Sequence, residues 1–407
     1  MRRVCTRKTH AAQWIAAVAG LAMLAWSGVS AGAAPLNQLS KEEIADGWIL
    51  LFDGETLFGW ETYGDAPWRV ADGAIVSDGG DEGYARTTTE FCDFILRLQY
   101  RISEYGNSGI FFRAGTDPEP WYTGYEMQID DGDWSNPTGS IYNIALAEHP
   151  GDKLVTEVEK WQDVELRAEG DHITVTLNGK KVVDARDNMY ARGVFHLQHY
   201  PTDMKVEFRN IRLKPLGLKS IFNGEDLTGW KIYPDRKSEF SVLPGGLLNI
   251  KNGNGQIETE GQWKDFALQL DIISNGDHLN SGVFFRNVPG RWWAGYESQI
   301  RNQWKGDDRT QPVDYGTGGI YNQQPARKVV SSDREWFTKT IIAHGNHMAV
   351  WVNGYPVSDF TDTRPVGLNA RRQCRLEGGT ITLQGHDPTT DLSFRNIKAV
   401  EYAARAE

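Results

Sequence analysis

The feature that most constrains this chain is a series of short sequence blocks that occurs twice. Residues 52–60 return at residues 222–230, and both copies end in a Gly-Trp pair. Five further pairs follow in the same order: residues 107–113 and 280–286, 124–129 and 295–300, 138–143 and 317–322, 177–179 and 352–354, and 208–211 and 394–397. The offset between copies varies from 170 to 186 residues, whereas solenoid repeats have periods of roughly 20–50 residues. We therefore expect a tandem duplication of a whole domain.

The length of 407 residues accommodates two such domains, each large enough for its own core. We place the first at residues 46–214 and the second at residues 219–403, with a junction that contains Pro and Gly. Residues 1–33 resemble a signal peptide, with basic residues first, then an apolar stretch, then small residues that fit a cleavage site. We expect cleavage and export to the periplasm or the extracellular space. The alternative, a retained membrane anchor, needs about 20 apolar residues.

Charge and cysteine usage exclude several classes of partner. The formal net charge is -11, and loss of residues 1–33, which hold four Lys or Arg and no Asp or Glu, makes it -15. Nucleic acids and anionic membranes need clustered cations, so neither is an expected partner. The mature chain would keep only Cys92 and Cys374, one in each domain, which predicts no disulfide framework and no zinc site. None of these features indicates an oligomeric state or a membrane span in the mature protein.

The apolar pattern predicts an all-β fold. Apolar residues alternate with polar ones in short runs bounded by Asn-Gly, Asp-Gly and Gly-Gly turns. Residues 172–183 and 347–357 each predict a hairpin around an Asn-Gly pair. About a dozen such strands in each domain fit a double-sheet jelly-roll β-sandwich. One short helix is expected near residues 40–43, with Ser40 as its N-cap.

Strand alternation sorts the repeated polar residues onto the faces that point away from the core. Tyr296 and Ile300 share one face of their strand, which leaves Glu297 and Gln299 on the other. The outward residues are Arg286, Glu297, Gln299, Gln384 and His386 in the second copy, and Arg113, Glu126, Gln128, Asp130, His196, Gln198 and Tyr200 in the first. If their strands are neighbours, they form a polar concave surface. The alternative is an ordinary solvated sheet face, whose Arg–Glu pairs contribute little.

Two further motifs each have two interpretations. The acidic turn at residues 130–133 fits either a calcium site or a polar loop, and the second copy has Arg301 where the first has Asp130. The aromatic residues at 121–122 and 292–293 precede the Glu-containing strands. Trp293 and its counterparts could stack on sugar rings or pack in the interior.

Seven blocks of the second copy together resemble the 3-keto-disaccharide hydrolase family: residues 222–230, 280–286, 295–300, 317–322, 351–354, 383–386 and 394–397. The resemblance covers the mature chain as two copies, and the second follows it more closely. It implies a concanavalin-like sandwich and action on glycosides already oxidised to a 3-keto sugar.

The resemblance also implies roles for the outward residues. Glu297 would be the base that removes the C2 proton, His386 the acid, and Arg286 the group that stabilises the enolate. Gln299, Gln384 and Tyr321 would hold hydroxyl groups. No cofactor is certain, although a divalent metal bound by Glu297 and His386 could assist or replace Arg286.

The first copy departs from this pattern. Its residues 197–200 read Leu-Gln-His-Tyr, so its histidine, His199, is displaced by one position onto the opposite face. It keeps four substrate-binding candidates: Arg113, Glu126, Gln128 and Asp130. Catalysis in the second copy with substrate binding in the first fits this asymmetry. The alternatives are a non-catalytic tandem carbohydrate-binding or adhesion protein, in which two weak sites raise avidity, and a structural role at the cell surface.

Overall fold

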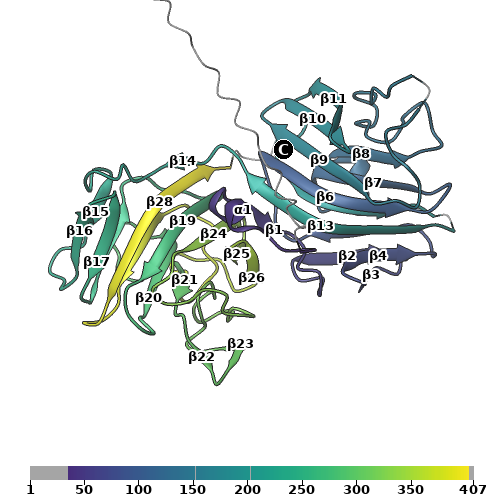
Figure 1. The fold of residues 1–407 in the computed structure, drawn as a ribbon. Helices are drawn as coiled ribbons and strands as arrows, with labels where there is room; N and C mark the ends of the chain where they lie inside the picture. The colour runs from purple at the N-terminus through teal and green to yellow at the C-terminus, as the bar shows by residue number, and fades with distance from the viewer. Residues whose placement is uncertain (1–34, 152, 202, 403–407) are drawn as a thin grey trace, which may run out of the picture. The chain divides into compact units, whose positions relative to one another are not determined.

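The structure of the chain is a computed structural model that describes residues 35–402 except residues 152 and 202. The predicted signal peptide lies outside the described residues. In the described part only α1 (Lys41–Ala45) and the single 3₁₀ turn η1 (Pro120–Tyr122) are helical (Figure 1). The predicted helix is confirmed, since the Ser40 side chain accepts a hydrogen bond from the Glu43 N–H at 3.1 Å. No helix in this part of the chain is long and apolar enough to cross a membrane.

The first copy forms two antiparallel sheets packed as a sandwich. The larger sheet has eight strands in the order β11-β10-β9-β6-β13-β4-β3, with β1 paired to β13, and the smaller has five in the order β2-β5-β12-β7-β8. The strands of the larger sheet are β1 (Ile49–Leu50), β3 (Arg69–Ala71), β4 (Ala74–Asp78), β6 (Phe94–Ile102), β9 (Gln162–Glu169), β10 (His172–Leu177), β11 (Lys180–Arg186) and β13 (Lys205–Pro215). Those of the smaller sheet are β2 (Trp60–Gly64), β5 (Gly83–Thr87), β7 (Asn107–Ala114), β8 (Tyr125–Asp130) and β12 (Val194–His199).

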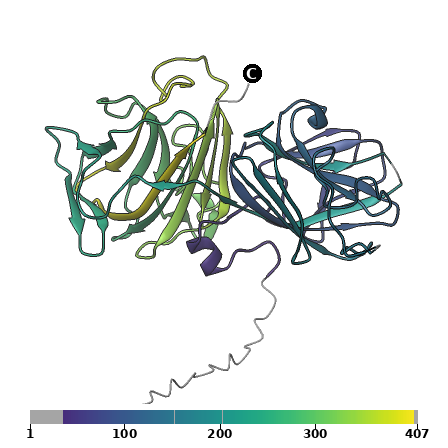
Figure 2. The ribbon, with the colours of Figure 1, turned by 90° about the horizontal axis from the view of Figure 1, so that it is seen from above.

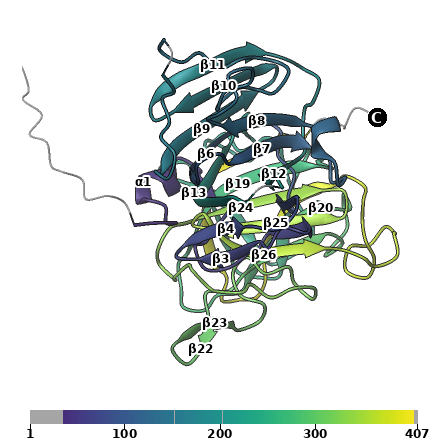
Figure 3. The same ribbon diagram turned by 90° about the vertical axis from the view of Figure 1, so that its right-hand side faces the viewer.

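The second copy repeats this topology, and Figure 2 shows its two layers facing each other. Its sheets have the orders β16-β17-β28-β19-β24-β25-β26, with β14 paired to β28, and β15-β18-β27-β20-β21. The larger sheet contains β14 (Lys219–Ser220), β16 (Glu239–Leu243), β17 (Leu247–Lys251), β19 (Phe266–Ser274), β24 (Phe337–His344), β25 (His347–Val352), β26 (Tyr355–Thr361) and β28 (Asp391–Glu401). The smaller contains β15 (Trp230–Ile232), β18 (Gly255–Thr259), β20 (Ser281–Asn287), β21 (Tyr296–Ile300) and β27 (Thr380–Gly385). A separate hairpin, β22 (Trp304–Lys305) with β23 (Asp308–Pro312), extends beyond these sheets (Figure 3).

Both predicted Asn-Gly hairpins are confirmed. Asn178 and Gly179 have φ values of 49° and 78°, and Asn353 and Gly354 have 49° and 72°. Two successive positive φ values define the turn whose twist matches that of the flanking strands, and Asn-Gly adopts it at low cost. The turns connect β10 to β11 and β25 to β26.

The predicted alternation of core and outer residues holds along β6 and β21 and along the first half of β20. β6 alternates regularly between buried and more exposed positions along its nine residues. In the second copy Val283, Phe285, Tyr296 and Ile300 all belong to one buried apolar cluster. Burial of such side chains contributes roughly 1.5–3 kcal/mol each, and it fixes which face of β20 and β21 carries polar groups.

Residues of the two sandwiches also contact each other. The indole N–H of Trp351 donates to the Leu50 carbonyl at 2.8 Å, and the Thr88 hydroxyl donates to Asp359 at 2.6 Å. Trp351 belongs to the same buried apolar cluster as the core of the first sandwich.

Candidate functional site

The smaller sheet of the second sandwich carries a group of polar side chains on its outer face. The neighbouring strands β21, β20, β27 and β18 place residues opposite one another in rows. One row contains Gln299, Gly282, Gln384 and Gln256. The next contains Glu297, Phe284, Thr382 and Glu258. The predicted arrangement of Glu297, Gln299 and Gln384 on one face is therefore present.

A glycine makes room for the Glu297 carboxylate. A Cβ atom at Gly282 would lie 2.3 Å from Oε1 of Glu297, which is closer than real atoms approach. In the first copy a Cβ atom at Gly109 would lie 2.3 Å from Oε1 of Glu126. The Gly of each repeated Asn-Ser-Gly block thus allows the glutamate side chain to lie across the neighbouring strand.

The Glu297 carboxylate is buried and paired with a cation that the sequence analysis missed. Nη2 of Arg371, in the loop between β26 and β27, lies 2.5 Å from Oε2 of Glu297, and their side chains are 16% and 4% exposed. The guanidinium carbon lies 5.0 Å from the centre of the Tyr321 ring and 5.5 Å from that of Trp293. Nη1 of Arg371 is buried and has no hydrogen-bond partner among the described residues. A ligand oxygen could accept from this nitrogen.

Two opposing effects set the protonation of Glu297. Burial raises the pKa of its carboxyl, and the nearby Arg371 and His386 act against that rise. Arg371 contacts Oε2, which leaves Oε1, above Gly282, as the oxygen that can take a proton.

His386 belongs to a stack of aromatic rings beside this carboxylate. Its ring stacks on Trp293 with centroids 6.5 Å apart, and Trp293 stacks on Trp292 at 5.5 Å. Nδ1 of His386 lies 2.9 Å from Oδ2 of Asp387, a contact that fixes the orientation of the ring. Trp293 is 39% exposed, so part of its surface is open to a ligand.

The side-chain amides of three glutamines, Gln299, Gln384 and Gln256, complete the group. Gln299 donates to Asp314, at 3.0 Å to the carbonyl and 3.1 Å to the carboxylate. The Oε1 atoms of Gln384 and Gln256 are buried and have no partner among the described residues. A buried polar atom without a partner is costly, so these oxygens are suited to hydroxyl donors of a ligand.

The prediction for Arg286 is wrong in its geometry. The side chain is fully buried, and Nε and Nη1 donate to the carbonyls of Lys264 and Gly345, both at 2.6 Å. Nη2 lies 3.1 Å from Oδ1 of Asp265, and no hydrogen bond or ion pair among the described residues joins Arg286 to Glu297. Arg286 lies at a shift of the β20 register with a positive φ of 47°, so it does not continue the alternation from which its direction was predicted.

Arg113 makes the matching contacts in the first copy, so its side chain does not point outward as predicted. It donates to the carbonyls of Cys92 and Gly170 and pairs with Asp93 at 2.7 Å. These two arginines recur because they satisfy buried carbonyl groups. Asp130 also has a local role, since Oδ1 accepts from the N–H groups of Gly132 and Asp133.

The first copy lacks the cation. Glu126 is not fully buried, no ion pair reaches it in the described part of the chain, and burial together with Glu82 raises its pKa to about 8. Gln128 lies on the same face as Glu126, two residues along β8. At the other edge of this sheet, Tyr63 on β2 stacks on Tyr84 on β5, with ring centroids 5.1 Å apart. In the first copy, the position of His386 is held by Tyr200, and His199 is buried at the end of β12.

A loop insertion explains why only the second copy has Arg371. Tyr125 bonds to Asp187 and to the N–H of Tyr190, and Tyr296 bonds in the same way to Asp362 and to the N–H of Arg375. Three positions separate the first pair of partners and thirteen separate the second. The jump in the offset between the copies at this place was the available signal, but it does not show where the inserted side chains point.

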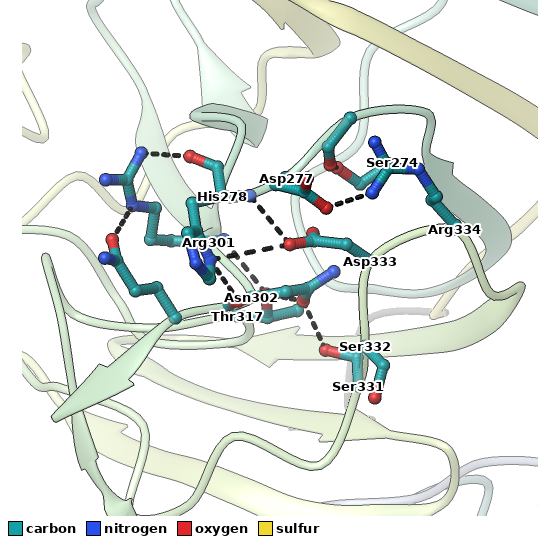
Figure 4. A network of polar contacts seen from close by, with 12 residues as sticks. Ser274, Asp277, His278, Arg301, Asn302, Thr317, Ser331, Ser332, Asp333 and Arg334 are labelled. Atoms are coloured by element: carbon teal, nitrogen blue, oxygen red, sulfur yellow. Dashed lines mark hydrogen bonds and ion pairs between the residues drawn. The ribbon is translucent and has the colours of Figure 1, made fainter. Parts of the chain in front are cut away.

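A second polar network, at the end of β21, is structural (Figure 4). Oδ1 of Asn302 accepts from the hydroxyls of Thr317 and Ser331, both at 2.6 Å. In the first copy Asp131 accepts from Thr138 and Thr156 in the same way. The network therefore ties loops together in both sandwiches, and it accounts for Asp131, one of the three carboxylates in the acidic turn that suggested calcium.

The donor sets do not fit a resident metal. The described residues contain no group of three or more His, Cys, Asp and Glu side chains placed to hold an ion. At the candidate site, Oε2 of Glu297 contacts a guanidinium, so a cation there would face Arg371.

A cavity of about 320 Å³ on the larger sheet of the first sandwich is lined by Arg97, Asp163 and other residues outside the Glu297 group.

Two jelly-roll-type sandwiches, with a buried Glu–Arg pair on the smaller sheet of the second, define the chain as a tandem β-sandwich protein. The chain belongs to the family of the 3-keto-alpha-glucoside-1,2-lyase-like domain, which matches residues 47–214 and 217–399. A 3-keto-disaccharide hydrolase from Bacteroides thetaiotaomicron is 36% identical over 94 residues, and the match covers 20% of this chain and 32% of that protein.

Solved structures also resemble parts of the chain. A provisionally assigned glycosyl hydrolase from Parabacteroides distasonis is 25% identical, with a TM-score of 0.40 over 44% of this chain and 99% of that one. The carbohydrate-binding module CBM66 from Bacillus subtilis is 21% identical, with a TM-score of 0.31 over 38% and 94%.

Proposed function

We propose that the chain is an exported carbohydrate-active enzyme that cleaves 3-keto-glycosides, with its active site in the second sandwich. The observation that carries the proposal is the contact between the buried Glu297 carboxylate and Arg371, with His386 beside them. Family membership supports the substrate class. Perturbed titratable groups gathered at one surface are typical of catalytic sites.

The chemistry begins with the ketone at C3, which acidifies the proton on C2. Oε1 of Glu297 takes that proton, and the electron pair forms an enolate whose oxygen carries the charge. The buried Nη1 of Arg371 donates to this oxygen, which is the role that the family resemblance implied for Arg286. The cation and the free N–H act where charge develops, so they favour the transition state over the bound ketone.

Elimination and hydration follow. The enolate electrons return to restore the C3 carbonyl, form a C1–C2 double bond and expel the C1 oxygen, which takes a proton from His386. Water then adds its hydroxyl to C1 and gives a proton to His386, while Glu297 returns a proton to C2; both side chains are restored and the net reaction is hydrolysis. The ketone supplies the activation, and a second carboxylate of the kind that ordinary glycosidases use is not required.

The remaining groups hold the sugar. The Gln384 oxygen accepts from hydroxyl groups, Tyr321 supports the Arg371 guanidinium, and Gln299 holds Asp314 beside the site. The open part of Trp293 stacks on a ring face. In this proposal the first sandwich is an accessory sugar-binding domain, because Glu126 lacks a cation and stays protonated at neutral pH.

The second candidate function is a non-catalytic tandem carbohydrate-binding protein. It is favoured by the exposed aromatic pair Trp121 and Tyr122, which are 39% and 70% exposed in the first copy. Such a protein needs aromatic surfaces and amides but no acid–base pair.

The deciding experiment incubates the mature protein with a 3-keto-glucoside in deuterated water, with and without a chelator. Glu297→Gln and Glu126→Gln serve as matched variants. The proposal expects cleavage with deuterium at C2, unaffected by the chelator and abolished only by Glu297→Gln. Saturable binding without cleavage by any form, with metals restored, would establish the binding protein instead. N-terminal sequencing of the exported chain tests cleavage after residue 33.

A further inference from the structure

A lysine occupies the core of the second sandwich directly behind the Glu297 strand. Lys339 in β24 is fully buried, at a position that alternation assigns to the core together with Ile341. Its Nζ reaches across to the other sheet and donates to the Ser298 carbonyl at 3.1 Å and to the Gln299 carbonyl at 2.8 Å. Both acceptors lie on β21, next to Glu297.

The first copy shows that the fold does not require this lysine. At the matching positions it has Val164 on β9 and Met127 on β8, whereas the second copy has Lys339 and Ser298. Both first-copy residues are buried in the apolar core. A buried cation costs free energy unless it is compensated, and an apolar pair of similar volume is often as stable or more so. The lysine is therefore present in the copy that has the complete acid–base group, and its cost points to a role there.

We propose that Lys339 is a positioning residue for Glu297, which fixes the main chain of β21 and places a positive charge behind the carboxylate. The inference rests on the proposed role of Glu297 as the base. An ammonium group near a carboxylate favours its ionised form, and ionised Glu297 is the form that can remove a proton.

The charges around both groups are consistent with this role. Arg371 and His386 face Glu297 from the loops on either side of β27, and Asp314 opposes them. Burial lowers the pKa of Lys339 to about 7, and the Glu297 carboxylate opposes that fall. The Glu297 carboxylate thus acts on Lys339 although the two groups lie on opposite faces of β21.

The test is Lys339→Met in the full chain, together with a double variant, Lys339→Val with Ser298→Met, which reproduces the pair of the first copy. We expect a folded protein whose acidic limb of kcat/KM moves up by about one pH unit, a roughly tenfold loss below the limb. Val164→Ala, at the matched interior position, is the control: it lowers stability without moving the limb. An unshifted limb in folded Lys339→Met overturns the inference.

A titration without substrate separates this inference from the proposed function. Carbon-13 NMR of glutamate-labelled full chain follows the Glu297 carboxyl, identified by its loss in Glu297→Gln. A higher Glu297 pKa in Lys339→Met supports the inference even if no 3-keto-glucoside is cleaved. An unchanged pKa overturns it even if the enzyme is active.

Discussion

Nη2 of Arg371 lies 2.5 Å from Oε2 of Glu297, and this contact joins a loop insertion of the second copy to a strand that both copies share. Glu297 and Glu126 occupy matching positions in the two copies, but in the part of the chain that the structure describes only Glu297 is paired with an arginine. Glu297 has a cation and a nearby imidazole, whereas burial and Glu82 act on Glu126 without an ion pair in the described residues. The surroundings of the two carboxylates therefore differ through loop residues more than through the repeated strands.

Arg371→Gln should remove most of the activity. Loss of a preorganised donor at a developing oxyanion costs about 10²–10³ in kcat. The pKa of Glu297 should also rise, because Arg371 is the first group that opposes the effect of burial. Arg372→Gln is the control, since that side chain is exposed on the same loop. Equal kcat values for the two variants would remove Arg371 from the mechanism.

Gly282→Ala should displace the base. The new Cβ would meet Oε1 of Glu297 at 2.3 Å, and the flexible carboxylate must move to relieve the contact. A misplaced catalytic group of this kind can cost about 10²-fold in rate. Gly109→Ala creates the same contact with Glu126, so both variants should lose similar stability. Steady-state kinetics should show a kcat loss in Gly282→Ala alone; a kcat loss in Gly109→Ala as well would place chemistry in the first copy.

His386→Gln should slow substrates according to their leaving groups. A 3-keto-glucoside with an alkyl leaving group needs a proton on the departing oxygen and should lose about 10²–10⁴-fold in rate. A nitrophenyl leaving group departs as an anion and should be nearly unaffected. The measurement compares kcat/KM for both substrates in wild type and variant. A uniform loss would instead assign His386 to binding, through its stack on Trp293.

Alternation along strands was sufficient to predict the outer faces of the strands and the presence of Glu297, Gln299 and Gln384 on one of them. Glu297 and Gln299 lie opposite the core side of β21 because Tyr296 and Ile300 are apolar, and that pattern is visible in the sequence. The predicted direction of the Arg286 side chain is wrong because a register shift and a positive φ at that residue break the alternation. Arg371 could not be predicted because it lies in an irregular loop, where no periodicity indicates the direction of a side chain.

Arg286→Lys should weaken the fold without altering the chemistry. A lysine cannot reproduce the contacts of the guanidinium with two carbonyls and Asp265, so buried acceptors lose partners. Loss of such a network costs about 3–5 kcal/mol. Arg113→Lys should destabilise the first sandwich similarly, because Arg113 makes the matching contacts. Calorimetry should show a lower Tm in both variants, and activity measurements should show a normal kcat per folded Arg286→Lys molecule. An unchanged Tm with a lost kcat would instead place Arg286 in the active site.

The Glu126 carboxyl should make the first sandwich less stable as the pH rises. Its pKa is raised from an ordinary value of 4.5 to about 8, first by burial and then by Glu82. Between these values the folded state holds a proton that the unfolded state releases, so the free energy of unfolding falls with increasing pH. Glu126→Gln is neutral at every pH and avoids this loss. Denaturant unfolding should give nearly equal stabilities at about pH 4 and a variant that is more stable by roughly 1–3 kcal/mol at about pH 8. Glu82→Gln removes only the smaller cause of the raised pKa, so it should reduce in part the slope of the free energy of unfolding against pH. Identical slopes for wild type and Glu126→Gln would show that Glu126 is ionised in the folded protein.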